Sequence, residues 1–203
     1  MRLSVAGFAV SFCLITSIGA RGASTDFSDL TAYQEFVAGE SIDSLGVSFV
    51  VSPYIVGNES VIVSGEFEKD FILSLRGFAL DLVLPSTAEQ ISLYYNDGAG
   101  SRLIVNGVEP TFGGDLFGDF FSRLDGTTVE GVSISTDVMT QGTWRSGNRE
   151  FIIAEEGVLT LRGPIDSFNI GGLELSIDNV SVRVPEPASW MLLGIASLLA
   201  RRR

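Results

Sequence analysis

The sequence predicts an all-β fold, an antiparallel β-sandwich of jelly-roll type over residues 24–183. Apolar residues in this region recur at every second position over short runs, which is the period of half-buried strands. Glycine, asparagine and aspartate cluster between the runs, as expected for tight turns. With 203 residues and 45% hydrophobic content, the chain is long and apolar enough for one domain with a core. We expect an N-terminal signal helix before this domain and a single transmembrane helix after it.

About ten short strands are expected, each defined by its alternating apolar side chains. In chain order these are Phe71, Leu73 and Leu75; Phe78, Leu80, Leu82 and Leu84; Ile91, Leu93 and Tyr95; Leu103 and Val105; Val132 and Ile134; Phe151 and Ile153; Leu159 and Leu161; Leu173, Leu175 and Ile177; and Val180, Val182 and Val184. The turn signals are Asn96-Asp97-Gly98, Asn106-Gly107, Gly113-Gly114, Asp125-Gly126, Ser146-Gly147-Asn148, Gly163-Pro164 and Gly171-Gly172.

Three segments do not follow the strand pattern. Ser28–Phe36 has loosely helical spacing and is either a short helix or an irregular opening segment. The polar, glycine-rich region 113–149 is expected to hold the longest loops. Glu155-Glu156, followed by glycine, is expected to form a turn between strands.

Composition excludes several classes of function. The chain has no histidine, which removes histidine-based catalysis, zinc sites and haem ligation. Its single cysteine, Cys13, lies in the N-terminal apolar run, so a processed chain has no thiol or disulfide. The net charge is −12, and residues 24–183 hold 24 acidic and 8 basic residues, a net charge of −16. Such an acidic surface repels nucleic acid.

The N-terminus has the pattern of a secretory signal peptide, residues 1–23. Arg2 supplies a positive start, Leu3–Ile18 is uncharged and mostly apolar, and Ala20 and Gly22 are small residues. We expect cleavage near Ala20–Ala23. A buried or transmembrane N-terminal helix is the alternative.

The C-terminus has three consecutive features. Residues 184–187 read Val-Pro-Glu-Pro, Ala188–Ala200 is an apolar stretch of 13 residues, and Arg201, Arg202 and Arg203 end the chain. As a helix, 13 residues span about 20 Å, less than the roughly 30 Å hydrocarbon core, and snorkelling arginines cover part of the difference. The basic end predicts a cytoplasmic C-terminus and an exported domain.

These three features, in this order, resemble the PEP-CTERM sorting signal of Gram-negative bacteria. The resemblance covers about the last 20 residues and implies processing by an exosortase, a membrane-embedded cysteine protease or transpeptidase. Val184, Pro185, Glu186 and Pro187 would then form the sorting motif, with the arginines as the membrane stop. Two prolines keep this motif extended, as a protease needs. A plain membrane anchor behind a proline linker is the alternative.

The middle of the chain has a second, weaker resemblance. Gly46-Val47-Ser48-Phe49, Asn96-Asp97-Gly98 before Leu103–Gly107, and Ile177-Asp178-Asn179-Val180 are similar to motifs of exported jelly-roll domains that precede this tail. Such domains look like galactose-binding or concanavalin-type sandwiches. A generic β-sandwich is the alternative.

A structural calcium is one candidate ligand, because calcium takes several oxygen donors. Asp178 and Asn179 lie in the last strand and Asp26 and Asp29 in the opening segment, and first and last strands can be neighbours in a jelly roll. The alternative is that these side chains are solvated or cap turns. A weaker candidate is the cluster of Asp115 and Asp119, which lacks regular calcium-loop spacing.

Carbohydrate is the other candidate ligand, because sugar sites combine flat aromatic rings with polar side chains. We select Tyr94, Trp144 and Arg145, with Tyr54 and Tyr95 as further aromatics. Tyr94 is expected to face outward and Tyr95 inward, and Trp144 is expected in a polar loop. Ordinary packing is the alternative for all of them.

No nucleophile elbow, phosphate loop or dinucleotide fingerprint appears, so we expect no enzymatic activity. The sequence predicts a protein that is exported across the inner membrane, held transiently by its C-terminus, and delivered to the cell surface or extracellular matrix. Its partners would be signal peptidase, exosortase and extracellular polysaccharide. A lectin-like, carbohydrate-binding jelly roll is the alternative function.

Overall fold

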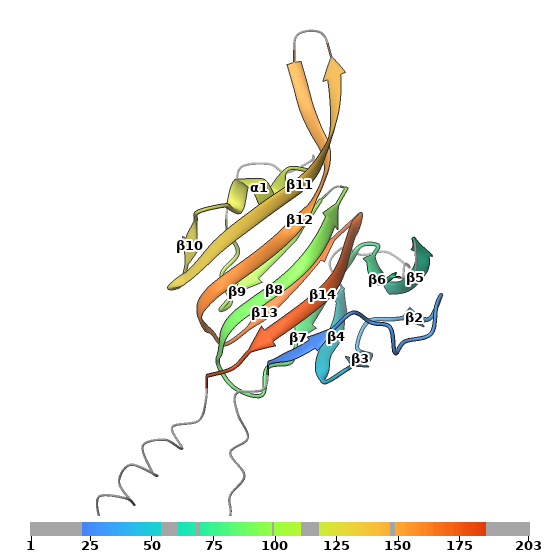
Figure 1. Ribbon diagram of the computed structural model, residues 1–203, viewed down its shortest axis with the longest axis vertical. Helices are drawn as coiled ribbons and strands as arrows, with labels where there is room; N and C mark the ends of the chain where they lie inside the picture. The colour runs from blue at the N-terminus through green and yellow to red at the C-terminus, as the bar shows by residue number, and fades with distance from the viewer. Residues whose placement is uncertain are drawn as a thin grey trace, which may run out of the picture. The chain divides into compact units, whose positions relative to one another are not determined.

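The computed structural model describes residues 22–53, 61–67, 70–98, 100–110, 118–146 and 149–185. These residues lie within one compact unit, Arg21–Pro185. Strands dominate it and every strand pairing is antiparallel, which confirms the predicted all-β class (Figure 1). The predicted signal helix, apart from residues 22–23, and the predicted C-terminal helix lie outside the described residues. None of the helices in the described ranges is long and apolar enough to cross a membrane.

The strands form a larger and a smaller sheet. The larger has the order β10-β11-β12-β8-β14-β6-β5-β2, and β1 also pairs with β14. Its strands are β1 (Ala23–Thr25), β2 (Glu35–Phe36), β5 (Val61–Phe67), β6 (Asp70–Leu75), β8 (Ala88–Asp97), β10 (Thr128–Val129), β11 (Val132–Ser146), β12 (Arg149–Ile165) and β14 (Leu175–Arg183). The smaller has the order β3-β4-β7-β13-β9, with β3 (Ser41–Ser44), β4 (Val47–Pro53), β7 (Phe78–Leu82), β9 (Arg102–Val105) and β13 (Phe168–Gly172).

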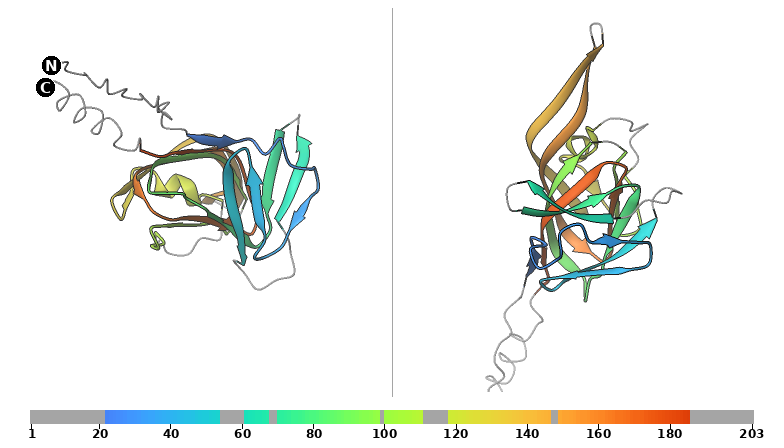
Figure 2. Two further views of the ribbon diagram at one scale, coloured as in Figure 1. Left: turned by 90° about the horizontal axis from the view of Figure 1, so that it is seen from below. Right: turned by 90° about the vertical axis from the view of Figure 1, so that its right-hand side faces the viewer.

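One hydrophobic core joins the two sheets. On β8 the alternation buries Leu93 and Tyr95 completely, while Tyr94 between them stays partly exposed. Phe49 of β4 and Leu80 of β7 are fully buried on the smaller sheet and belong to the same core cluster. The strands of both sheets surround this shared interior in a sandwich-like arrangement (Figure 2). Each buried side chain of this size contributes about 1.5–3 kcal/mol of hydrophobic stabilisation.

A short helix, α1 (Phe120–Leu124), closes one side of the core next to β11. Its three apolar residues, Phe120, Phe121 and Leu124, are all buried. The Phe121 ring centroid lies 4.3 Å from that of Tyr95, so the two rings are in close contact inside the core. This helix was not predicted from the sequence, because five residues are too few to show a helical period.

Several local predictions were wrong. Within 28–36 the chain makes turns and then β2, so of the two predicted alternatives the irregular segment is the observed one. The region expected to hold the longest loops contains α1, β10 and the whole of the 15-residue strand β11. Glu155-Glu156, Gly163-Pro164 and Gly171-Gly172 lie inside strands rather than in turns. The tip of the β11–β12 hairpin extends past β8, whose pairing with β12 begins only at Glu155 (Figure 1).

Candidate functional site on the outer face of the larger sheet

The outer face of the larger sheet carries a row of side chains centred on Tyr94. Strand register places Tyr94 of β8 opposite Val158 of β12 on one side and Asp178 of β14 on the other. Asp137 of β11 is opposite Val158 and is exposed. Because side chains of paired residues lie on the same face, Tyr94 has Asp178, which is only 4% exposed, on one side and Asp137 beyond Val158 on the other.

The rows on either side of Tyr94 are polar. One row contains Ser135, Thr160, Ser92 and Ser181. In it the hydroxyls of Ser92 and Thr160 are 3.3 Å apart and form a hydrogen bond. The other row contains Glu156, Asn96, Ser176 and Ser74. The face therefore offers hydroxyl, amide and carboxylate groups around one tyrosine, across the five neighbouring strands β11, β12, β8, β14 and β6.

The Tyr94 phenol is held in its neutral form. Partial burial raises its pKa to about 12, helped by a hydrogen bond with Glu156 and by the negative charges of Glu156 and Asp178. Tyr94 therefore keeps its hydroxyl proton at neutral pH and offers a flat ring with a hydroxyl at its edge. The structure places Tyr94 outward and Tyr95 inward, as expected from the alternation.

Trp144 and Arg145 do not join Tyr94. The prediction that Trp144 lies in a loop is wrong, because Trp144 and Arg145 belong to β11 and are opposite Phe151 and Glu150 of β12. Tyr94 is opposite Val158, seven residues farther along β12 than Phe151, which corresponds to about 23 Å along a strand. The side chains of Trp144 and Arg145 lie outside the described part of the structure, as does Tyr54.

The candidate calcium residues are only partly brought together. β1 and β14 are neighbours, with Thr25 opposite Val180, so the first and last strands do pair. Asp26 accepts a hydrogen bond from the Ser28 hydroxyl at 2.7 Å, which is the main reason that its pKa is lowered.

The other three residues of this candidate site are already engaged in hydrogen bonds. Asp29 accepts from the Ser44 hydroxyl and from the Leu45 N–H at 3.1 Å. The Asn179 backbone and side-chain N–H groups donate to Asp178 at 2.6 and 2.8 Å.

Within the described residues, no group of three or more acidic side chains is placed to hold a metal ion. Calcium at Asp26, Asp29, Asp178 and Asn179 stays a prediction. In the weaker cluster, Asp119 forms an ion pair of 3.4 Å with Arg123, and Asp115 lies outside the described residues.

The predicted sorting motif, residues 184–187, begins where the last strand ends. β14 ends at Arg183, and Val184 and Pro185 follow it without regular structure. Glu186, Pro187 and Arg201–Arg203 lie outside the described residues. Ala23, the last residue assigned to the signal peptide, is already in β1 and is opposite Val182. Cleavage just after Ala20 would therefore preserve β1, whereas cleavage after Ala23 would shorten it.

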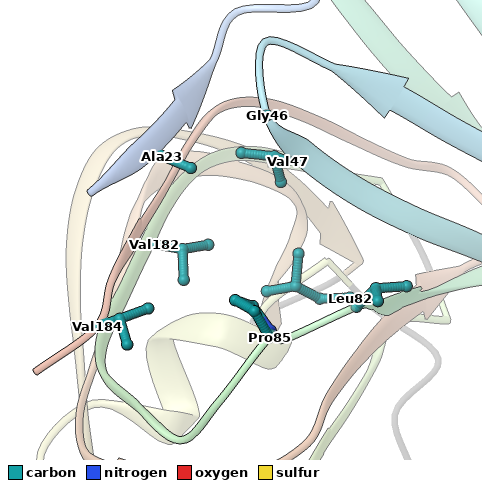
Figure 3. A pocket seen from close by; sticks show the side chains of 8 residues that line it. Ala23, Gly46, Val47, Leu82, Pro85, Val182 and Val184 are labelled. Carbon is teal, nitrogen blue, oxygen red and sulfur yellow. The ribbon is translucent and has the colours of Figure 1, made fainter. Parts of the chain in front are cut away.

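A small apolar hollow lies beside these chain ends (Figure 3). Its volume is about 70 Å³, and it is lined by Ala23, Gly46, Val47, Leu82, Val83, Pro85, Val182 and Val184. Ligand pockets usually enclose about 300 Å³ or more and include polar groups. This hollow lacks both features, so the outer face around Tyr94 is the better candidate site.

Two buried acids were not predicted from the pattern of strands and turns. Glu155, taken as part of a turn, lies in β12 and is 1% exposed, and Asp97 opposite it on β8 is fully buried. The signal that could have identified Glu155 is its position two residues before Gly157 and four before Leu159, on the buried side of the alternation.

Comparison of the chain with protein-family models, with curated proteins and with solved structures finds no match in any of the three.

Proposed function

We propose that this chain is an exported, non-enzymatic protein of the cell surface or extracellular matrix, sorted through its C-terminal PEP-CTERM-like segment by an exosortase. One observation carries the proposal: the compact unit occupies Arg21–Pro185, which in the sequence lies between the predicted signal peptide and the PEP-CTERM-like tail. Ala23 pairs with Val182, so the first and last strands close the same sheet. The domain therefore needs neither end segment to complete its pairing.

The position of β14 suits a protein held or pulled by its C-terminus. This strand pairs with β8 along most of its length and also with β6 and β1. A strand inside a sheet resists removal better than an edge strand, because ladders on both sides must break together. Pro185 follows two residues after the end of the strand and cannot extend the ladder. The predicted Pro-Glu-Pro motif would thus begin immediately after a firmly held strand in the sequence.

We also propose that the sandwich is of jelly-roll type. The chain crosses repeatedly between the sheets: β7, β9 and β13 belong to the smaller sheet, while β8, β12 and β14 belong to the larger. Such alternation between two antiparallel sheets is the pattern of jelly rolls.

The proposal is tested by the intact mass of the mature protein recovered from cells that contain an exosortase. We expect the mass of a chain that begins between Arg21 and Ser24 and ends before Ala188, so that the apolar stretch and the arginines are absent. A chain that still ends at Arg203 in such cells would contradict processing and leave a plain membrane anchor.

The outer face around Tyr94 favours a second function, carbohydrate binding at the cell surface. A neutral tyrosine among hydroxyl, amide and carboxylate groups can stack on a sugar ring and exchange hydrogen bonds with its hydroxyls. An acidic face selects neutral or basic glycans over anionic ones, because like charges repel. This function is compatible with the first, since a sorted surface protein can hold matrix polysaccharide.

Replacing Tyr94 by alanine is expected to weaken glycan binding about tenfold, the effect of losing about 1.4 kcal/mol of ring contact. A glycan array identifies the ligand, and calorimetry then measures its affinity for the wild type and the variant. Tyr33→Ala is the matched control, because Tyr33 is 63% exposed and lies outside this face. Loss of binding in Trp144→Ala alone would show that the site is on the β11–β12 hairpin. An array that finds no ligand would contradict carbohydrate binding.

A further inference from the structure

Two buried carboxylates lie side by side inside the sandwich. Asp97 of β8 is directly opposite Glu155 of β12, and their exposed fractions are 0% and 1%. Cβ atoms of directly opposite residues on antiparallel strands are about 4.5–5.5 Å apart. Both side chains lie on the inner face, as does Tyr95. This pair is distinct from Asp26, Asp29, Asp178 and Asn179.

The contacts of the pair leave one carboxylate oxygen unsatisfied. Glu155 Oε1 accepts a hydrogen bond from the Ser122 N–H at 2.8 Å and one from the Tyr95 hydroxyl at 3.5 Å. Asp97 Oδ1 accepts from the Ser101 hydroxyl. Glu155 Oε2 is buried and has no hydrogen-bond partner, and no ion pair reaches Glu155 from the described residues.

Physical chemistry makes this arrangement costly without a compensating cation. Like charges directly opposite on neighbouring strands are destabilising, and a buried carboxylate without a partner costs several kcal/mol in desolvation. Arg102, five residues after Asp97, forms an ion pair with Glu109, and Arg123 of α1, the helix that contains Ser122, forms one with Asp119. Burial and the charges of Glu155, Asp97 and Asp125 together raise the pKa of Tyr95, which places negative charge around one phenol.

We propose that a calcium ion binds between Asp97 and Glu155, inside the sandwich. Calcium prefers carboxylate, hydroxyl and backbone oxygens and tolerates irregular geometry. Glu155 Oε2 and the Asp97 carboxylate supply the charge, and Ser101 supplies a hydroxyl on the same side. The ion ties β8 to β12 where the hairpin leaves the sheet, so its role is structural.

Calcium titration of the chelator-treated protein tests the proposal. We expect the melting temperature to rise saturably, by about 5–10 °C at a calcium concentration one hundred times the Kd. Glu155→Gln keeps the size and the acceptor for Ser122 and is expected to abolish the rise. Glu156→Gln is the matched control, since Glu156 points to the opposite face, and it should retain the rise.

Two results would overturn the proposal: a melting temperature that calcium leaves unchanged in the wild type, or a rise that persists fully in Glu155→Gln. If Glu155→Gln does not fold, terbium luminescence of the wild-type protein tests the site instead. Terbium should displace calcium and emit on excitation of tyrosine, and Tyr95→Phe should lose most of that emission. Absent emission in the wild type, or unchanged emission in Tyr95→Phe, also contradicts the site.

Discussion

Replacing Gly157 by alanine is expected to lower the free energy of unfolding by at least about 3 kcal/mol, the scale of severe overpacking in a core. A Cβ atom at this position would lie 2.4 Å from the carbonyl oxygen of Asp137 and 3.0 Å from the Cα of Val138. Both obstacles are backbone atoms of β11, which a rotamer change cannot move. β12 also pairs with β8 on its other side, so it cannot shift away without losing a second ladder.

Gly142→Ala is the matched control for this substitution. Its Cβ would meet only ordinary contacts, the nearest being the Ala154 side chain at 3.6 Å. We expect its stability to stay within about 1 kcal/mol of the wild type. Urea unfolding of residues 22–185 measures both variants under the same conditions. Equal stability of the two variants would show that β11 does not lie against Gly157 as described.

The close approach at Gly157 also explains which parts of the fold could be predicted. Alternation on β8 correctly placed Leu93 and Tyr95 inside and Tyr94 outside, because period two is a local property of the chain. The Asn106-Gly107 turn was also predicted, and both residues have the positive φ values, 52° and 78°, that a tight hairpin requires. Local chemistry decides such features.

Features decided by distant partners could not be predicted. Gly163 was taken as a turn residue, yet it lies in β12 at a register shift between Arg162 and Ile165. Its φ is 139°, and a Cβ there would lie 2.6 Å from the Gly131 carbonyl oxygen. The neighbouring backbone at Gly131 therefore requires a glycine at position 163. A glycine needed for close approach and a glycine needed for a turn look the same in one sequence.

The candidate site also combines features set by the local sequence with features set by distant strand partners. The outward orientation of Tyr94 follows from the alternation along β8. Which side chains lie next to it on the outer face depends on the register between strands. Trp144 of β11 pairs with Phe151 of β12, whereas Tyr94 of β8 pairs with Val158 of β12. The seven residues from Phe151 to Val158 separate Trp144 from Tyr94. Similarly, Glu155 and Asp97 are 58 residues apart in sequence, and only the pairing of β8 with β12 makes them neighbours.

Ending the chain after Pro185 is expected to move nearly all of the protein from the membrane fraction to the soluble fraction, without loss of fold. The truncated chain keeps every strand of the described unit, since β14 ends at Arg183. We therefore expect its melting temperature to stay within about 2 °C of that of the mature protein. The removed part holds the apolar stretch and three arginines, which are the parts that would retain the chain at a membrane. Immunoblotting of soluble and membrane fractions measures the change.

Glu186→Ala in the full-length chain separates sorting from simple anchoring. If Glu186 supplies the charge that the protease reads, this variant stays in the membrane fraction and retains its C-terminal arginines, by intact mass. Glu174→Ala is the control, an exposed acid on the domain whose loss should leave processing unchanged. Processing of Glu186→Ala at the wild-type rate would mean that the proline-flanked glutamate is not the recognition element. Membrane association of the truncated chain would mean that the domain itself holds the protein at the cell envelope, which would favour glycan binding at the Tyr94 face as the anchor.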